Sequence, residues 1–203
     1  TFILELNNIK IGITALNSSW LCKDKDDHGT LLLGKCQIEN SLLKIKDCDL
    51  KLAIGHHPLE FFQDFDKESV KLILYKKYDA YFTGHVHSLE SSYTQDLAGN
   101  IFISIANSTI GDFPIERKQV NGYSILSIYP GEKIHACYRK YVEDHEVFVP
   151  NTDIGTETGC RDFKILKDEK LIQFQKNELL VETLESKNVS KLNEHLIMGH
   201  GST

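Results

Sequence analysis

The sequence has no long apolar run, no excess of positive charge and no regular cysteine pattern. No stretch approaches the roughly 18 apolar residues that span a bilayer, and no charged-then-apolar signal segment opens the chain, so we expect no membrane segment. The formal net charge of −6 provides no overall basic field to attract nucleic acid or anionic lipid. Five widely spaced cysteines without a Cys-x-x-Cys pair favour free thiols over disulfides and a cytoplasmic, reducing location.

What is present is an ordinary globular composition, with 203 residues, 41% hydrophobic and 26% charged. This length suffices for one domain with a sizeable core, or for one domain and a tail. Isoleucines at alternating positions predict a strand over residues 9–16, and short apolar runs predict strands over 50–55 and 80–83. Apolar residues at helical spacing predict helices over 34–45 and 67–78.

Two of the predicted strands end in a glycine followed by histidine. The first continues as Gly55-His56-His57-Pro58 and the second as Gly84-His85-Val86-His87. Strand, helix and strand within about thirty residues form a crossover unit, which favours parallel neighbours and brings both ends to one sheet edge. Open α/β sheets bind ligands at that edge, and neutral imidazole is a common ligand of transition metals. The pattern therefore predicts half of a metal site containing three imidazoles.

The two histidine segments, in this order, resemble those of the calcineurin-like metallophosphoesterase superfamily. The resemblance implies that His56 and His85 bind one metal ion and that His87 binds another. It extends to Asn17-Ser18-Ser19-Trp20 and to residues 121–125, and covers roughly residues 9–142. It implies an α/β fold, a two-sheet αββα sandwich, and two divalent metal ions (Mn²⁺, Fe or Zn²⁺).

Other motif blocks of that superfamily are missing from this sequence. The blocks Asp-x-His, Gly-Asp-x-x-Asp and Gly-Asn-His-Asp/Glu should precede the strand at 9–16, and none is present; the one Gly-Asp, at Gly111-Asp112, follows the histidine segments. These blocks would carry the metal-bridging aspartate. Because the chain also opens on Thr1, we expect the natural domain to begin before it and the fold to be N-terminally incomplete.

The resemblance implies a metal-dependent phosphoesterase that cleaves phosphodiester or phosphomonoester bonds with a metal-activated hydroxide. Nucleotides and nucleic acids are among the possible substrates, and no membrane is involved. His57 is the catalytic candidate, and we expect its side chain to point away from that of His56. It would then support a metal ligand, face the substrate or serve a purely structural role. Asn17 and Trp20 are candidates for substrate binding, with Trp20 as a packing residue the alternative.

Three alternatives remain open. Three histidines alone suit a single zinc ion with an open fourth position. The chain is alternatively a catalytically incomplete binding or regulatory module within a larger protein. In the third alternative, the histidines bind no metal and are hydrogen-bonded residues at the ends of strands.

The remaining expectations concern organisation. We expect residues 1–142 to form the C-terminal part of a metallophosphoesterase domain, and residues 143–203 to form an extension or linker towards a further domain. Two antiparallel hairpins, predicted over 89–105 and 123–141, should belong to the second sheet. The charged residues Asp26, Asp27 and His28 should lie in a solvated loop, and Asp64 and Asp66 in a loop anchored by phenylalanines.

Overall fold

The computed structural model describes most of the first 164 residues, namely residues 1–23, 27–86, 90–96, 99–105, 121–129, 132–154 and 156–164. The chain divides into two compact units. The first contains Thr1–Tyr129 and Lys133–Lys164, and the second contains Pro130–Glu132 and Ile165–Thr203. Within the described part, no helix is both long and apolar enough to cross a membrane.

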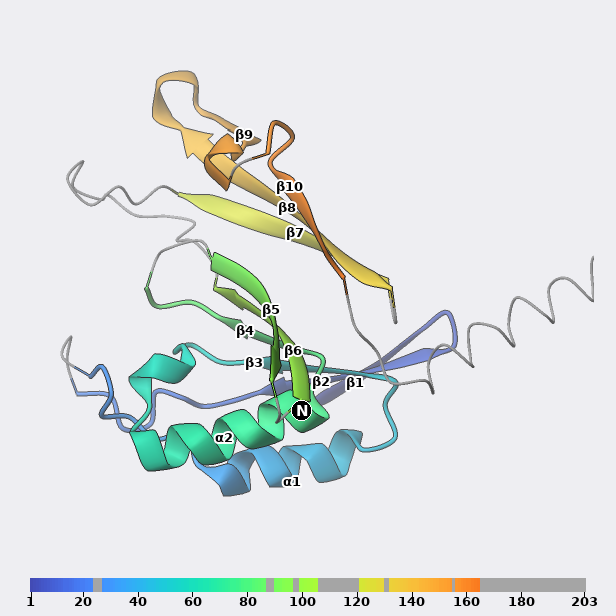
Figure 1. The fold of residues 1–203 in the computed structure, drawn as a ribbon, viewed down its shortest axis with the longest axis vertical. Helices are drawn as coiled ribbons and strands as arrows, with labels where there is room; N and C mark the ends of the chain where they lie inside the picture. The colour runs from blue at the N-terminus through green and yellow to red at the C-terminus, as the bar shows by residue number, and fades with distance from the viewer. Residues whose placement is uncertain are drawn as a thin grey trace, which may run out of the picture. The chain divides into compact units, whose positions relative to one another are not determined.

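The first compact unit contains a six-stranded sheet with the order β1-β2-β3-β4-β6-β5 (Figure 1). Neighbouring strands from β2 to β6 in this order are parallel, and the edge strands β1 and β5 pair antiparallel. The edge strand β1 was not predicted. The strands are β1 (Phe2–Leu6), β2 (Ile9–Ala15), β3 (Leu50–Ile54), β4 (Ala80–Thr83), β5 (Glu90–Asp96) and β6 (Gly99–Ile105).

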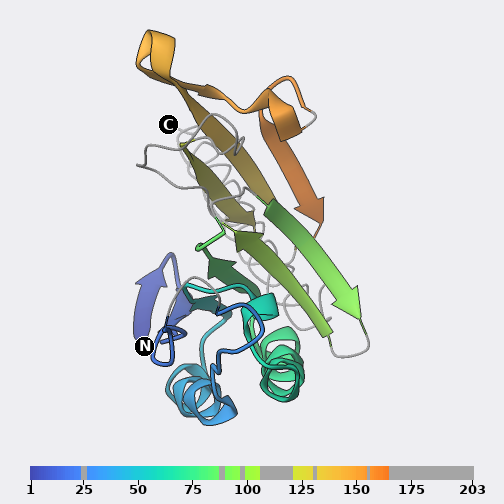
Figure 2. The same ribbon diagram turned by 90° about the vertical axis from the view of Figure 1, so that its left-hand side faces the viewer.

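Two helices, α1 (Lys35–Ile45) and α2 (Asp64–Lys77), lie together on one face of this sheet (Figures 1 and 2). Each connects two parallel strands, as the crossover unit predicted. Their buried residues include Ile38, Val70 and Leu74, and they enter one apolar core with the sheet. Gly12 permits the close approach of α1 to β2, because a Cβ there would lie 2.6 Å from the Ile45 Cβ.

The start of α2 differs from the sequence-based prediction. The helix begins at Asp64, three residues before the predicted boundary, so Asp64 and Asp66 belong to its first turn and not to a loop. A carboxylate there is favourable because the first turn carries the positive end of the helix dipole. Asp66 is also buried, and its Oδ2 accepts the N–H groups of Leu33 and Gly34 at 2.6 and 3.1 Å. This aspartate fixes the segment that leads into α1.

A second, four-stranded sheet has the order β10-β8-β7, with β9 paired to β8. Its strands are β7 (Gly122–Tyr129), β8 (Lys133–Val142), β9 (Val147–Pro150) and β10 (Cys160–Lys164). Phe102 of β6 is fully buried and contacts Phe163 of β10, with ring centroids 5.1 Å apart. The described residues thus form two sheets and two α-helices of a mixed α/β fold, and the expected two-sheet class is confirmed.

One expectation about this second sheet was wrong. The β5–β6 hairpin joins the first sheet, because β6 pairs parallel to β4 with Ala80 opposite Phe102, and only the β7–β8 hairpin belongs to the second. Beyond residue 142, β9 and β10 both pair with β8 and belong to the first compact unit; the division of the chain into two domains at residue 142 stays a prediction.

The structure also contains a disulfide that the cysteine spacing did not suggest. Cys137 of β8 and Cys160 of β10 lie directly opposite one another in the antiparallel ladder, with a Cα–Cα distance of 4.0 Å, and are bonded. Strand pairing brings together two cysteines 23 residues apart, which no local motif reveals. Cys22, Cys36 and Cys48 are free.

Candidate metal centre

The ends of three neighbouring parallel strands form the candidate site. β2 is followed by Asn17 and Ser18, β3 by residues 55–58, and β4 by Gly84 and His85. Backbone hydrogen bonds continue the ladder beyond the strands, since the Gly84 N–H donates to the His56 carbonyl at 3.0 Å. The parallel order thus brings both histidine segments to one sheet edge, as predicted.

His56 and His85 approach each other closely at this edge. The His56 Nε2 lies 3.0 Å from the His85 Nδ1, although the residues are 29 positions apart in the sequence. Two nitrogens bound at about 2.0–2.1 Å to the same ion lie about 3 Å apart when they occupy adjacent coordination positions. The pair therefore has the spacing of two ligands of one metal ion.

The backbone at His85 has an unusual conformation. His85 has a φ of 68°, one of few positive values at non-glycine residues in the described part of the chain. The Val86 N–H donates to the Gly84 carbonyl at 2.9 Å, so His85 is the central residue of a three-residue γ-turn. Turns of this kind with a positive central φ are rare and strained, and such strain concentrates at functional sites.

His57 does not point away from the other histidines, as we had expected. Its ring centroid lies 4.5 Å from that of His85 and 4.7 Å from that of His56, and the three rings form one cluster. The side chain is only 2% exposed. The bend after β3 is the reason, because residues that leave a strand into a turn no longer alternate between the two faces.

Ser18 holds the backbone and the ring of this segment. Its Oγ accepts the N–H groups of His56 and His57, each at 3.1 Å, and lies 3.1 Å from the His57 Nδ1. Both lone pairs of the hydroxyl oxygen accept these N–H groups, so the hydroxyl contacts Nδ1 as a donor, through its own hydrogen. His57 is then a neutral imidazole with the proton on Nε2, which faces the Cys22 Sγ at 3.7 Å.

The environment disfavours the charged form of His57. Burial lowers the pKa of His57 below its ordinary value, and the neighbouring His85 and His56 lower it further. A hydrogen bond with the Ser18 backbone and the carboxylate of Asp27 raise this pKa, but by less than the burial and the two histidines lower it. His57 therefore stays neutral in the folded chain at neutral pH.

This lowered pKa predicts that the metal-free protein loses stability in mild acid. Below about pH 6.5 the unfolded chain binds a proton at His57 that the folded chain resists, so the free energy of unfolding should fall with decreasing pH, by up to about 1.4 kcal/mol per unit. Urea unfolding between about pH 7.5 and 5.5 measures this slope. His57→Gln should flatten it. An equal slope in that variant would contradict the assignment to His57.

Phe61 and Asp27 belong to the surroundings of the cluster and were missed. The buried Phe61 ring lies 4.6 Å from that of His85 and 5.5 Å from that of His57, measured between centroids. Asp27 is 6% exposed and its Oδ2 accepts the Lys23 N–H, so the prediction of a solvated loop is wrong for this residue. Its charged neighbours in the sequence gave no indication of this burial.

The structure describes two of the other predicted site residues, Asn17 and Trp20, in the segment after β2. The Asn17 backbone N–H and carbonyl are bound by the Gln37 side chain, and its Oδ1 accepts the Ser19 N–H. Trp20 is 53% exposed, and its Nε1 donates to the Leu32 carbonyl at 2.7 Å. His87 lies outside the described residues, as does the polar segment 107–112.

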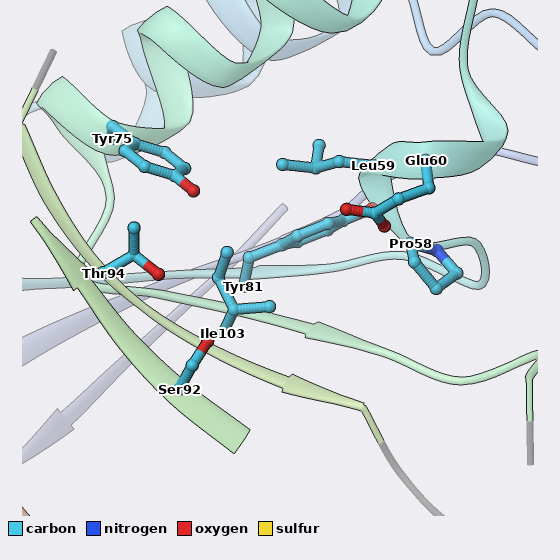
Figure 3. A pocket seen from close by; sticks show the side chains of 8 residues that line it. All are labelled: Pro58, Leu59, Glu60, Tyr75, Tyr81, Ser92, Thr94 and Ile103. Atoms are coloured by element: carbon cyan, nitrogen blue, oxygen red, sulfur yellow. The ribbon is translucent and has the colours of Figure 1, made fainter. Parts of the chain in front are cut away.

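A cavity of about 210 Å³ lies beside the histidine segment (Figure 3). It is lined by Pro58, Leu59, Glu60, Tyr75, Tyr81, Ser92, Thr94 and Ile103. Among the described residues that line it, Glu60 is charged and none is a lysine or an arginine. A phosphate anion would meet a like charge there, so the cavity does not suit such a substrate.

The donor set fits part of a metal centre. Ligand atoms of His56, His57 and His85 all lie within 4.8 Å of one another, and no carboxylate of the described residues joins this group. Imidazole suits zinc and iron, but a bridging carboxylate is needed to hold two cations close together. The described residues therefore fit one divalent ion, and not two.

Comparison with known proteins gives a relative for half of the chain. No family model matches. The chain is 28% identical over 107 residues to an uncharacterised metallophosphoesterase-like protein, YydB, of Bacillus subtilis; the match covers 50% of this chain and 22% of that protein. The chain thus spans about a fifth of its relative's length.

Two solved structures of Vps29 variants from Entamoeba histolytica also align. The double mutant has 18% identity and a TM-score of 0.33, with 49% of this chain and 47% of that one covered. The single mutant has 11% identity and a TM-score of 0.32, with 76% and 98% covered. These scores are too low to support an argument, and the fold rests on the topology described above.

Proposed function

We propose that the intact protein hydrolyses phosphate esters with bound divalent metal. The paired histidine segments resemble those of the calcineurin-like metallophosphoesterases, and a metallophosphoesterase-like protein is similar to half of the chain. The observation that carries the proposal is the 3.0 Å separation of His56 Nε2 and His85 Nδ1 at a parallel sheet edge. Phosphodiesters and phosphomonoesters, including nucleotides and nucleic acids, are the proposed substrates. Two metal ions, Mn²⁺, Fe or Zn²⁺, are proposed for the intact site, with His87 as a further ligand.

Each residue of the cluster has a distinct task in this proposal. His56 and His85 would hold one ion, which when bound polarises a phosphate oxygen and activates water. Ser18 fixes the backbone that presents His56, and Phe61 keeps water from one side of the His85 ring. Because the His57 side chain is buried and both ring nitrogens have neighbours, we assign it a positioning role in place of the catalytic one. Asn17 and Trp20 remain candidates for contact with substrate at the rim.

The test is hydrolysis of bis(p-nitrophenyl) phosphate by the intact protein after complete removal of metal. Activity should be absent from the metal-free protein and should return with Mn²⁺ or Zn²⁺. Activity that survives metal removal would contradict the proposal.

A non-catalytic binding module is the second candidate, favoured by the absence of a carboxylate from the cluster within the described residues. In that case the intact protein would bind metal without hydrolysing any phosphate ester. Two measurements on the intact protein separate the candidates. A binding module would take up metal in calorimetry but show no turnover in the hydrolysis assay. A cytoplasmic location and a further domain beyond the first compact unit remain part of the proposal.

A further inference from the structure

A second cluster of metal-binding side chains lies on the four-stranded sheet. On β8, His135 and Cys137 are two residues apart and share a face, and on β10 Cys160 and Asp162 do the same. The antiparallel register sets Cys137 opposite Cys160 and His135 opposite Asp162. Four side chains of types that can bind metal, one histidine, two cysteines and one aspartate, are therefore adjacent on two paired strands. None of them belongs to the histidine cluster of the first sheet.

The contacts within this group are directional. The Cys137 Sγ lies 3.1 Å from the His135 Nε2, and the His135 Nδ1 lies 2.5 Å from the Asp162 Oδ1. Lys133 Nζ binds the other oxygen of Asp162 at 2.8 Å. When His135 is neutral and its Nδ1–H donates a hydrogen bond to Asp162, the lone pair of the ring lies on Nε2, directed at the Cys137 sulfur. A histidine whose second nitrogen is bound by a carboxylate is the usual arrangement of a metal ligand.

The disulfide itself offers no hydrogen-bond donor to this lone pair. In the disulfide neither sulfur carries a proton, so two acceptors, the His135 Nε2 and the Cys137 Sγ, face each other. After reduction, the His135 Nε2 and the sulfur atoms of Cys137 and Cys160 could all donate electron pairs to one cation. Two thiolates and one imidazole form a ligand set that favours zinc, with a fourth position open.

We propose that the reduced protein binds one Zn²⁺ ion through Cys137, Cys160 and His135, with Asp162 as the residue that orients His135. The disulfide of this structure is the metal-free form of the site. A phosphine reductant transfers two electrons to the disulfide and takes up oxygen from water as its oxide, which yields two thiols. Zinc then displaces the two thiol protons. The proposal is independent of the phosphoesterase function.

Cobalt titration of the reduced protein tests the site, because Co²⁺ replaces Zn²⁺ and absorbs strongly only when thiolates bind it. One equivalent of Co²⁺ should produce thiolate-to-cobalt charge-transfer absorption, and Zn²⁺ should remove it. The oxidised protein should show none. The Cys22 thiol lies 3.7 Å from the His57 Nε2, but it is free in the oxidised protein as well, so a cobalt band from the histidine cluster would appear before reduction. A band that appears only after reduction therefore belongs to Cys137 and Cys160.

Three variants refine the test. His135→Asn and Asp162→Asn should each weaken Zn²⁺ binding, measured by competition with a chromogenic chelator, by about 10- to 100-fold. Cys36→Ser, at a free and exposed cysteine of α1, is the matched control and should change nothing. Absence of the band, or unchanged affinity in His135→Asn, would overturn the proposal. If reduction unfolds the chain, recovery of its circular dichroism on adding Zn²⁺ would support the site, and no recovery would overturn it.

Discussion

Replacing His85 by alanine in the intact protein should lower phosphodiester hydrolysis by at least about 100-fold. The change removes the Nδ1 that lies 3.0 Å from the His56 Nε2, and even residues that only support a metal ligand contribute 10- to 100-fold. Steady-state hydrolysis of bis(p-nitrophenyl) phosphate at saturating Mn²⁺ measures the loss. His145→Ala, at an exposed histidine outside the cluster, should keep full activity.

A second substitution at the same position separates metal binding from backbone strain. His85→Gly also removes the ligand, but glycine adopts the φ of 68° without steric cost. The two variants should be equally inactive, while the glycine variant should be about 1 kcal/mol more stable than the alanine variant. If His85→Ala keeps more than about one-tenth of wild-type activity, His85 is not an essential ligand.

Ser18→Ala should cost about 3 kcal/mol of unfolding free energy, although it removes only one oxygen atom. That oxygen binds the N–H groups of His56 and His57 and contacts the His57 Nδ1, and each buried group left without a partner costs about 1–3 kcal/mol. Urea unfolding of the metal-free chain measures the change.

The matched control for this serine is Ser69→Ala on α2. The Ser69 Oγ makes a single bond to the Phe65 carbonyl in an exposed turn, so the loss should stay within about 0.5 kcal/mol. A cost below about 1 kcal/mol for Ser18→Ala would show that water replaces the lost hydroxyl, and that Ser18 does not hold the site.

Local patterns were sufficient to predict the part of the fold that carries the site. Apolar runs and helical spacing gave the order strand, helix, strand, and that order fixes parallel pairing of β3 and β4. The glycine and histidine that end each strand then had to meet at one edge, which predicted the proximity of His56 and His85. The side of the strand from which His57 leaves was wrong, because alternation ends where the strand does.

What the sequence did not reveal depends on partners far along the chain. Ser18 binds a backbone group 38 residues away, and Cys137 pairs with a cysteine 23 residues away. The hairpin of β5 and β6 was predicted from its turn, but the turn does not determine that β6 pairs with β4. Asp27 was assigned by its charge, whereas its burial is set by the residues that fold over it.

Tyr81 connects the interior of the molecule to the cluster. Its side chain is fully buried, its hydroxyl donates to the His57 carbonyl at 2.7 Å, and a Cβ at Gly55 would meet that hydroxyl at 2.7 Å. The Tyr81 hydroxyl oxygen thus packs against Gly55 and also supports the His57 carbonyl. A substitution at position 55 or 81 would therefore disturb the packing of the interior and the support of the His57 carbonyl at once.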